Sequence, residues 1–297
     1  MYKITSRWPH QSTIKVEWNL GKRCNYDCSY CPKEIHDNTS PHVEIEYVYA
    51  TIDKLTAIGK PIRLSFTGGE PTVHPKFREI VEYAKHKGVT WINVTTNGTR
   101  TCDFYNNLSV DQLVFSIHVE HNWRKVLDTM LTVHNKSRNV IAQIMAHHQH
   151  MNSIREIYST CKDNSVPATV RRIRWVTDNR DVFDDLRYAP TDLEWIKKKT
   201  ATVESNCVID DGILMHSNDV IKLSLNSFES WNCNAGVESL MINWDGEVYR
   251  ATCRVGNSLG NIYLDTDFYF PDSGITCSRK WCTCASDIPI TKIKKDE

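Results

Sequence analysis

The sequence lacks several features that would assign a protein to a broad class at once. It has no run of 18 apolar residues and no apolar stretch in its first segment, MYKITSRWPHQ, so we expect neither a membrane span nor a secretory signal peptide. It has no excess of charge, with 36 basic and 36 acidic residues, which argues against binding nucleic acid through bulk charge. Internal repeats and low-complexity segments are also missing. We therefore expect a globular, cytoplasmic protein with no nucleic-acid partner and no membrane contact.

Cysteine, in contrast, is abundant, with 11 residues in 297. In a reducing compartment disulfides are rare, so metal binding is the better first interpretation of clustered cysteines. Cys102, Cys161 and Cys207 have no partner at ligand spacing and are expected to be small buried residues. The others form two groups, the first with Cys24, Cys28 and Cys31, the second with Cys233, Cys253, Cys277, Cys282 and Cys284. Two sites are therefore predicted.

Between the two groups, strand-like and helical segments alternate along the chain. Apolar periodicity predicts strands over 13–20, 62–67, 89–95, 113–119, 140–146 and 169–176, and helices over 44–58, 77–87, 123–134 and 154–161. Such alternation implies an α/β fold with parallel strands and right-handed helical crossovers. On the pattern alone, a doubly wound sheet and a partial barrel remain alternatives.

The alternation ends after residue 176. Residues 178–188 are polar and loop-like, and Thr191 with Glu194 predicts a capping box for a short helix that reaches Thr200. The remainder is strand-like, and Asp245-Gly246 between SLMINW and EVYRAT predicts a β-hairpin with a type I′ turn. A second, smaller β-rich domain is expected from about residue 205.

The first cysteine group is one ligand short of a closed zinc site. Zinc usually takes four protein ligands; His36 could be the fourth, but Cys24-x3-Cys28-x2-Cys31 does not have zinc-finger spacing. An iron–sulfur cube held by three thiolates instead leaves one iron free of protein ligands and available for chemistry. The segments TGGEP (67–71) and TTNGT (95–99) end the next two strands, where ligands bind in open α/β sheets and barrels. Gly68 and Gly69 allow the backbone close to a ligand, and Glu70 offers an acceptor for an ammonium group.

This combination resembles the radical S-adenosylmethionine (radical SAM) superfamily. The match consists of the three-cysteine motif, Gly68-Gly69-Glu70 and Thr96-Asn97-Gly98, in the superfamily's order. The resemblance implies a partial (β/α)6 TIM-type barrel over residues 10–180, followed by a linker with a short helix over 181–204. A structural zinc or iron site is the alternative.

The resemblance also implies a chemistry. Cys24, Cys28 and Cys31 would be the catalytic residues that bind a 4Fe-4S cluster, whose fourth iron chelates S-adenosylmethionine. The reduced cluster cleaves that cosubstrate to a 5′-deoxyadenosyl radical, which abstracts hydrogen from the substrate. A flavodoxin- or ferredoxin-type protein is the expected electron donor.

Other residues receive roles by their position in the motifs. The resemblance places Tyr30 near the adenine, Gly68, Gly69, Glu70 and Asn97 in the cosubstrate site with Gly69 and Glu70 at the methionyl ammonium, and Ser116 at a ribose hydroxyl. His118 departs from the superfamily pattern; it is a candidate for contact with cosubstrate or substrate, with a satisfied strand-end histidine as the alternative.

Two further groups lie near the expected rim of the barrel. His147, His148 and His150 suggest either a second metal site or polar rim and cosubstrate contacts, and the rim is favoured because their spacing gives no particular coordination geometry. Arg172 and Arg174 alternate on the sixth strand, so they point either into the barrel toward an anion such as a carboxylate, or outward.

The second cysteine group resembles the SPASM/twitch region of radical SAM enzymes. Five cysteines are too few for two fully ligated clusters, so the shorter twitch form over residues 205–297, with one auxiliary 4Fe-4S cluster, is expected. Cys233 and Cys253 would supply two ligands, and two of Cys277, Cys282 and Cys284 the others. A zinc ribbon is the alternative.

The expected function is that of a radical SAM oxidoreductase or maturase acting on a peptide or a small polar metabolite, by oxidation or crosslinking. The rival is a non-catalytic iron–sulfur binding or electron-transfer protein. Gly68-Gly69-Glu70 favours the enzyme, because electron transfer has no use for an ammonium-binding loop beside a three-cysteine cluster.

Overall fold

The computed structural model describes residues 3–6, 13–34, 36–136, 139–173, 187–200, 206–209, 212–264 and 268–294. Its larger sheet has eight strands in the order β12-β11-β2-β3-β4-β5-β6-β7. The six from β2 to β7 run parallel, as the sequence pattern predicts. They are β2 (Ile14–Asn19), β3 (Ile62–Thr67), β4 (Trp91–Thr96), β5 (Gln112–His118), β6 (Val140–Ala146) and β7 (Ala168–Arg172).

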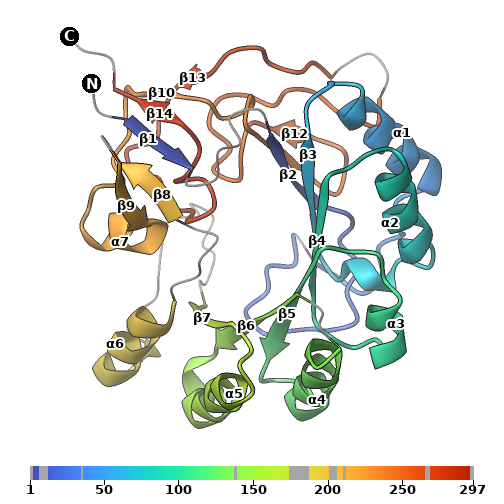
Figure 1. The fold of residues 1–297 in the computed structure, drawn as a ribbon, viewed down its shortest axis with the longest axis vertical. Helices are drawn as coiled ribbons and strands as arrows, with labels where there is room; N and C mark the ends of the chain where they lie inside the picture. The colour runs from blue at the N-terminus through green and yellow to red at the C-terminus, as the bar shows by residue number, and fades with distance from the viewer. Residues whose placement is uncertain are drawn as a thin grey trace.

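Helices cover the outer side of this curved sheet (Figure 1). They are α1 (Ile45–Thr56), α2 (Phe77–His86), α3 (Cys102–Asn106), α4 (Trp123–His134) and α5 (Met151–Asp163). In α4 the buried residues Val126, Leu127, Met130 and Val133 recur at helical spacing, and the Asn122 side chain caps the first turn by accepting from the Lys125 N–H at 3.3 Å. The five-residue α3 lies in a segment where the sequence pattern predicts no helix.

Helices on one face distinguish a partial barrel from a doubly wound sheet, which carries helices on both faces. On β2, Ile14, Val16 and Trp18 are fully buried beneath the helices. The alternate residues of the strand point to the opposite, inner face, where Glu17 and Asn19 are half-buried. The α/β partial barrel expected from the sequence is confirmed, and its inner face is polar.

The predicted hairpin forms, and it extends the barrel sheet. It consists of β11 (Ser239–Ile242) and β12 (Val248–Tyr249), and β11 pairs in parallel with β2. The predicted type I′ turn is wrong. The Asn243 N–H donates to the Glu247 carbonyl at 2.8 Å, which encloses a three-residue loop, and only Gly246 in that loop has a positive φ, +86°. A type I′ turn needs positive φ at both central residues, which Asp245 does not adopt.

A second sheet has the order β13-β10-β14-β1-β8-β9. Its strands are β1 (Lys3–Ser6), β8 (Asn206–Ile209), β9 (Ile213–His216), β10 (Asn232–Cys233), β13 (Ile275–Thr276) and β14 (Lys292–Ile293). The N-terminal β1 lies between β14 and β8, so the first strand of the chain belongs with the C-terminal ones (Figure 1). The chain therefore passes from the second sheet to the barrel sheet between β1 and β2, and returns to the second sheet between β7 and β8.

Among the described residues after the barrel, α6 (Pro190–Lys199) and α7 (Ser217–Lys222) are helical. The predicted capping box at Thr191 is wrong, because α6 begins one residue earlier, with Pro190 in its first turn and Ala189 at the cap without a side-chain hydrogen bond. Most of the predicted 178–188 loop lies outside the described residues.

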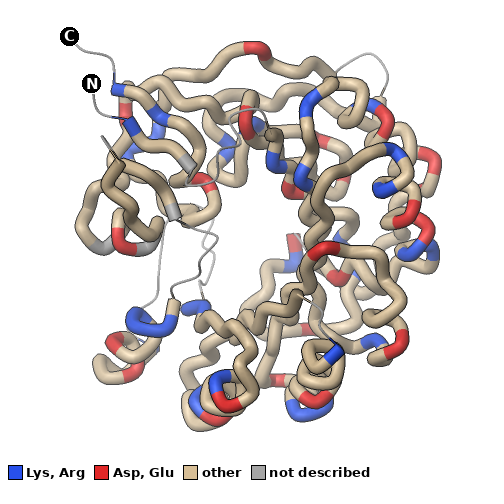
Figure 2. The backbone as a smooth tube through the Cα atoms, in the orientation of Figure 1, with Lys and Arg blue, Asp and Glu red and all other residues tan. Residues whose placement is uncertain are grey.

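Lysine, arginine, aspartate and glutamate are interspersed over the outer helices (Figure 2). No described helix is long and apolar enough to span a membrane.

Candidate active site

The first cysteine group lies in the loop that follows β2. Cys24 and Cys28 are buried, with 9% and 7% of their surfaces exposed, and Cys31 is half-buried. Burial, together with a smaller contribution from negative charge on a neighbouring thiol, raises the pKa of Cys28 to about 12 and of Cys31 to about 11. The Tyr26 N–H donates to the Cys24 sulfur at 3.4 Å. Three thiols grouped in this way need a cationic partner to be thiolates together, which fits a metal-bearing group.

The glycine loop after β3 packs directly on the backbone that leads into Cys24. The Gly69 N–H donates to the Gly21 carbonyl at 2.8 Å, and the Glu70 N–H to the Arg23 carbonyl at 2.9 Å. A β-carbon at Gly68, where φ is +122°, would lie 2.6 Å from the Gly21 carbonyl oxygen. One at Gly69 would collide with the Lys22 and Arg23 carbonyls. The sequence suggested close approach to a ligand; in the structure both glycines allow close approach to the cysteine loop.

The Glu70 side chain is used inside the protein. Only 3% of the residue is exposed, and burial raises the pKa of its carboxyl. The carboxylate accepts from the Thr72 N–H at 3.0 Å, the Thr72 and Thr96 hydroxyls at 2.5 and 2.8 Å, and the Asn97 N–H at 2.5 Å. Glu70 therefore joins the ends of β3 and β4, and contact with an ammonium group stays a prediction.

Asn97 links the end of β4 to the cysteine loop. Its side-chain NH₂ donates to the side-chain oxygen of Asn25 at 2.8 Å and lies 3.9 Å from the Cys24 sulfur. The Thr99 hydroxyl donates to the Asn97 side-chain oxygen at 2.8 Å. The Cys, Gly-Gly-Glu and Asn motifs are thus in direct contact at the carboxyl ends of three neighbouring strands.

At the end of β5, His118 contacts the cysteine loop from the other side. Its Nδ1 lies 2.6 Å from the Tyr30 hydroxyl and 3.4 Å from the Cys28 sulfur, and burial lowers the pKa of His118 to about 4. Tyr30 is itself buried, which raises its pKa. These contacts favour the alternative in which His118 is satisfied within the protein. Ser116 lies two residues earlier, on the same face of β5.

Glu120, which the sequence did not single out, also holds the cysteine loop. Its carboxylate accepts from the Ser29 N–H at 3.0 Å and lies 3.8 Å from Nε2 of His147. His121 stacks on Tyr26 with ring centroids 3.7 Å apart. The only signal in the sequence for these residues is their place directly after a strand of the barrel.

The histidine group on the rim packs as neighbouring rings, with His147 4.7 Å from His148 and 5.1 Å from His150 between centroids. Within the described ranges, no three His, Cys, Asp or Glu side chains converge on one metal-ion position. The arrangement therefore favours the polar-rim interpretation of these histidines over a second metal site.

The arginine on the inner face of β7 is Arg171, whose Nε donates to the Gln143 side chain at 3.4 Å. Arg172 pairs in register with Ala146, which is fully buried on the outer, helix-covered face. Residues that pair in register lie on the same face of a sheet, so Arg172 lies on the outer face. The alternative in which Arg172 points into the barrel is therefore wrong, since one residue along a strand changes the face. Arg174 lies outside the described residues.

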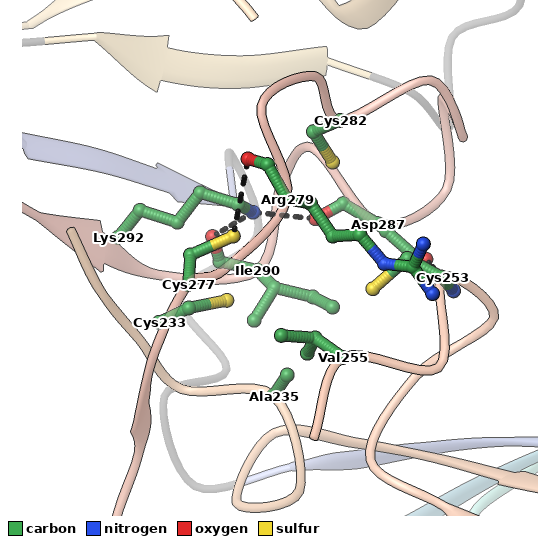
Figure 3. Close-up of a pocket in the computed structure, with 10 residues that line it drawn as sticks. All are labelled: Cys233, Ala235, Cys253, Val255, Cys277, Arg279, Cys282, Asp287, Ile290 and Lys292. Carbon is green, nitrogen blue, oxygen red and sulfur yellow. Dashed lines mark hydrogen bonds between the residues drawn. The ribbon is translucent and has the colours of Figure 1, made fainter. Parts of the chain in front are cut away.

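The second cysteine group forms a single cavity in the second sheet (Figure 3). Cys233, Cys253, Cys277 and Cys282 line it, together with the buried Asp287 and Lys292 and the exposed Arg279.

Cys233 on β10 pairs with Ile275 on β13. Cys277 follows Ile275 by two residues, so this pairing brings Cys277 to the same cavity as Cys233. Cys284 lies outside this lining, 2.9 Å from the Ser286 hydroxyl. Of the isolated cysteines, Cys161 and Cys207 are fully buried, as expected, and Cys102 is half-buried.

Three thiols in one loop at the carboxyl ends of parallel strands define an α/β barrel whose loop after β2 fits a metal-bearing group. More specifically, residues 18–161 match the model of the Radical SAM superfamily. This match bears out, for that part of the chain, the superfamily assignment made from the motifs.

Curated relatives match over shorter stretches of the chain. The Fe-coproporphyrin III synthase of Methanosarcina barkeri is 38% identical over 85 residues, which are 28% of this chain and 21% of the relative. The S-adenosylmethionine-dependent nucleotide dehydratase of Selenomonas ruminantium is 34% identical over 86 residues, 29% of this chain and 30% of the relative. The match thus spans less than a third of either relative's length.

Solved structures resemble the fold over most of the chain. Native anSMEcpe with bound AdoMet has a TM-score of 0.60 and 16% identity, covering 86% of this chain and 79% of its own. Streptococcus suis SuiB bound to the precursor peptide SuiA has a TM-score of 0.62 and 13% identity, covering 88% and 65%. At these identities the likeness establishes the fold alone, an α/β partial barrel with an additional C-terminal part.

Proposed function

We propose that this protein is a radical SAM oxidoreductase or maturase that modifies a peptide or a small polar metabolite. When bound at Cys24, Cys28 and Cys31, a 4Fe-4S cluster would supply the electron that cleaves S-adenosylmethionine to a 5′-deoxyadenosyl radical for hydrogen abstraction. The observation that carries the proposal is the packing of Gly68 and Gly69 onto the backbone that enters Cys24. A simple electron-transfer protein would not need this second loop at the cluster.

The surrounding residues have positioning roles in this proposal. Glu70 and Asn97 fix the ends of β3 and β4 against the cysteine loop, and Glu120 fixes the loop to the end of β5. The cosubstrate would bind at these strand ends, with Tyr30, Ser116 and His118 on the β5 side. Because the loop is tied to three strands, its thiols are held in place before the cluster binds.

Polar side chains on the inner face of the barrel support a polar substrate. Glu17 accepts from the Thr252 hydroxyl at 3.4 Å, and Arg171 contacts only Gln143 by a hydrogen bond in the described structure. A guanidinium in this position can bind a carboxylate or phosphate in bidentate fashion. A peptide substrate is further supported by SuiB, whose fold is similar and whose structure contains its precursor peptide.

We also propose one auxiliary 4Fe-4S cluster in the second sheet, bound by Cys233, Cys253, Cys277 and Cys282. Burial raises the pKa of Cys253 to about 12, so this thiol too needs a cationic partner to be a thiolate.

A zinc ion would need its four thiolates about 2.3 Å from one point, whereas a cubic cluster binds each thiolate to a different iron. The electron donor is proposed to be a flavodoxin- or ferredoxin-type protein, in the cytoplasm.

The proposal is tested by anaerobic incubation of the reconstituted, reduced protein with S-adenosylmethionine and a deuterated peptide or metabolite extract. Transfer of deuterium into 5′-deoxyadenosine would identify substrate fractions. A fully iron-loaded protein that releases no 5′-deoxyadenosine under any of these conditions would instead support the non-catalytic iron–sulfur protein.

A further inference from the structure

A buried lysine lies beside the four cysteines of the second cavity. Lys292, on β14, has 2% of its surface exposed. Its Nζ donates to the backbone carbonyls of Asp287 at 2.7 Å and of Ile288 and Ile290 at 3.0 Å each. Three acceptors match the three N–H groups of an ammonium, whereas a neutral amine has only two. The side chain is therefore held as a cation, with Nζ also 5.2 Å from the centre of the Phe228 ring.

The charge faces the cysteines. Lys292 lines the same cavity as Cys233, Cys253 and Cys282, whose sulfur atoms point into it (Figure 3). Burial raises the pKa of each of these thiols. The Lys292 charge opposes the rise at all three, whereas a negative charge on Asp287 adds to it. The field of the ammonium thus acts on the ligand set of the proposed auxiliary cluster.

The other charged groups of the cavity differ from Lys292 in burial or sign. Asp287 is buried, and its carboxylate accepts from the Cys253 N–H at 2.8 Å. Arg279 is exposed to solvent, which screens its charge. Lys292 is consequently the buried cation among the described residues that line the cavity.

We propose that Lys292 is a positioning residue that raises the reduction potential of the auxiliary cluster. Reduction adds one negative charge to a cluster, so a fixed positive charge nearby stabilises the reduced form more than the oxidised form. This inference rests on the proposed function of the four cysteines.

A raised potential suits a site that takes one electron from a substrate radical. The substrate cation that results loses a proton, and the electron passes on to a one-electron carrier protein of the flavodoxin or ferredoxin class.

The test measures the potential of the second cluster alone. In a protein whose Cys24, Cys28 and Cys31 are replaced by alanine, an anaerobic redox titration followed by electron paramagnetic resonance reports only the auxiliary cluster. Lys292→Met is expected to lower its midpoint potential. Lys294→Met removes an exposed lysine two residues away and is expected to leave the potential unchanged. An unchanged potential in Lys292→Met would overturn the proposal.

A second pair of variants covers loss of cluster binding. If Lys292→Met takes up no iron, two further variants separate the charge from the hydrogen bonds. Lys292→Gln retains two N–H donors without the charge, and Lys292→Arg retains the charge. A lowered potential in Lys292→Gln, or iron binding with normal potential restricted to Lys292→Arg, supports the role of the charge. Iron lost from all three variants would make Lys292 a structural residue only and overturn the proposal. Zinc in place of iron in the parent protein would refute the auxiliary cluster itself.

Discussion

The backbone N–H of Asn97 donates to the carboxylate of Glu70 at 2.5 Å, which joins the ends of two barrel strands beneath the cysteine loop. The same Asn97 reaches Asn25 in that loop through its side chain. Three motifs that are far apart in sequence are therefore one hydrogen-bonded unit. Disturbing any part of this unit should affect the cosubstrate site.

Glu70→Gln is expected to weaken this unit. In the variant an amide NH₂ would face either the Asn97 N–H or the threonine donors, which leaves a buried donor without an acceptor. The expected cost is about 1–3 kcal/mol of unfolding free energy, together with weaker binding of S-adenosylmethionine and normal iron at the first site. Denaturant unfolding and equilibrium dialysis measure the two effects. Unchanged affinity and stability would remove both roles from Glu70.

The second cysteine group offers a matched pair of variants. Cys253→Ala is expected to lose the auxiliary cluster, about four of the eight irons expected for two cubic clusters, while uncoupled cleavage of S-adenosylmethionine continues. Cys284→Ala should keep all the iron, because Cys284 lies outside the cavity beside Ser286. Iron analysis distinguishes them. Iron loss in Cys284→Ala with retention in Cys253→Ala would reverse the assignment.

His74 predicts a pH dependence of stability away from the metal sites. The Lys76 N–H donates to its Nδ1 at 3.2 Å, so Nε2 carries the proton in the 3.0 Å bond to the Val43 carbonyl, and protonation would remove the acceptor. Burial lowers the pKa of His74 in the folded protein. The unfolded chain therefore binds more protons, and stability is lost as the pH falls through the ordinary histidine pKa, about 6.5.

His74→Gln should show a shallower loss of stability between neutral pH and about pH 5 than the parent protein. Denaturant unfolding at a series of pH values makes the comparison, with the exposed His86 replaced as the control. Equal pH slopes in the parent and in His74→Gln would contradict the assignment.

Local patterns in the sequence predicted much of the barrel. Apolar periodicity located β2 to β7 and four of their helices, because each buries one face against the other. Pairing between distant segments was not predictable: β1 joins the C-terminal strands, and β11 adds to β2. These partners depend on which sheet edges remain free after the barrel forms, and local periodicity carries no such information.

At the site, the spacing of Cys24, Cys28 and Cys31 was sufficient to predict that three thiols lie in one loop, because three residues within a stretch of eight must lie close together. Side-chain direction was harder to predict. The inner-face arginine is Arg171 instead of Arg172, a difference of one residue in where β7 pairs. Glu120 was missed because a carboxylate after a strand has no distinctive pattern of its own.

The most direct test of the central claim compares the parent protein with Cys28→Ala in reductive cleavage of S-adenosylmethionine. Both are reconstituted with iron and sulfide under anaerobic conditions and reduced, and 5′-deoxyadenosine is quantified, with Cys102→Ala as the control for loss of a thiol elsewhere. We expect 5′-deoxyadenosine from the parent and Cys102→Ala proteins and none from Cys28→Ala, which should also lose about four irons. Equal 5′-deoxyadenosine from the parent and Cys28→Ala proteins would contradict this expectation.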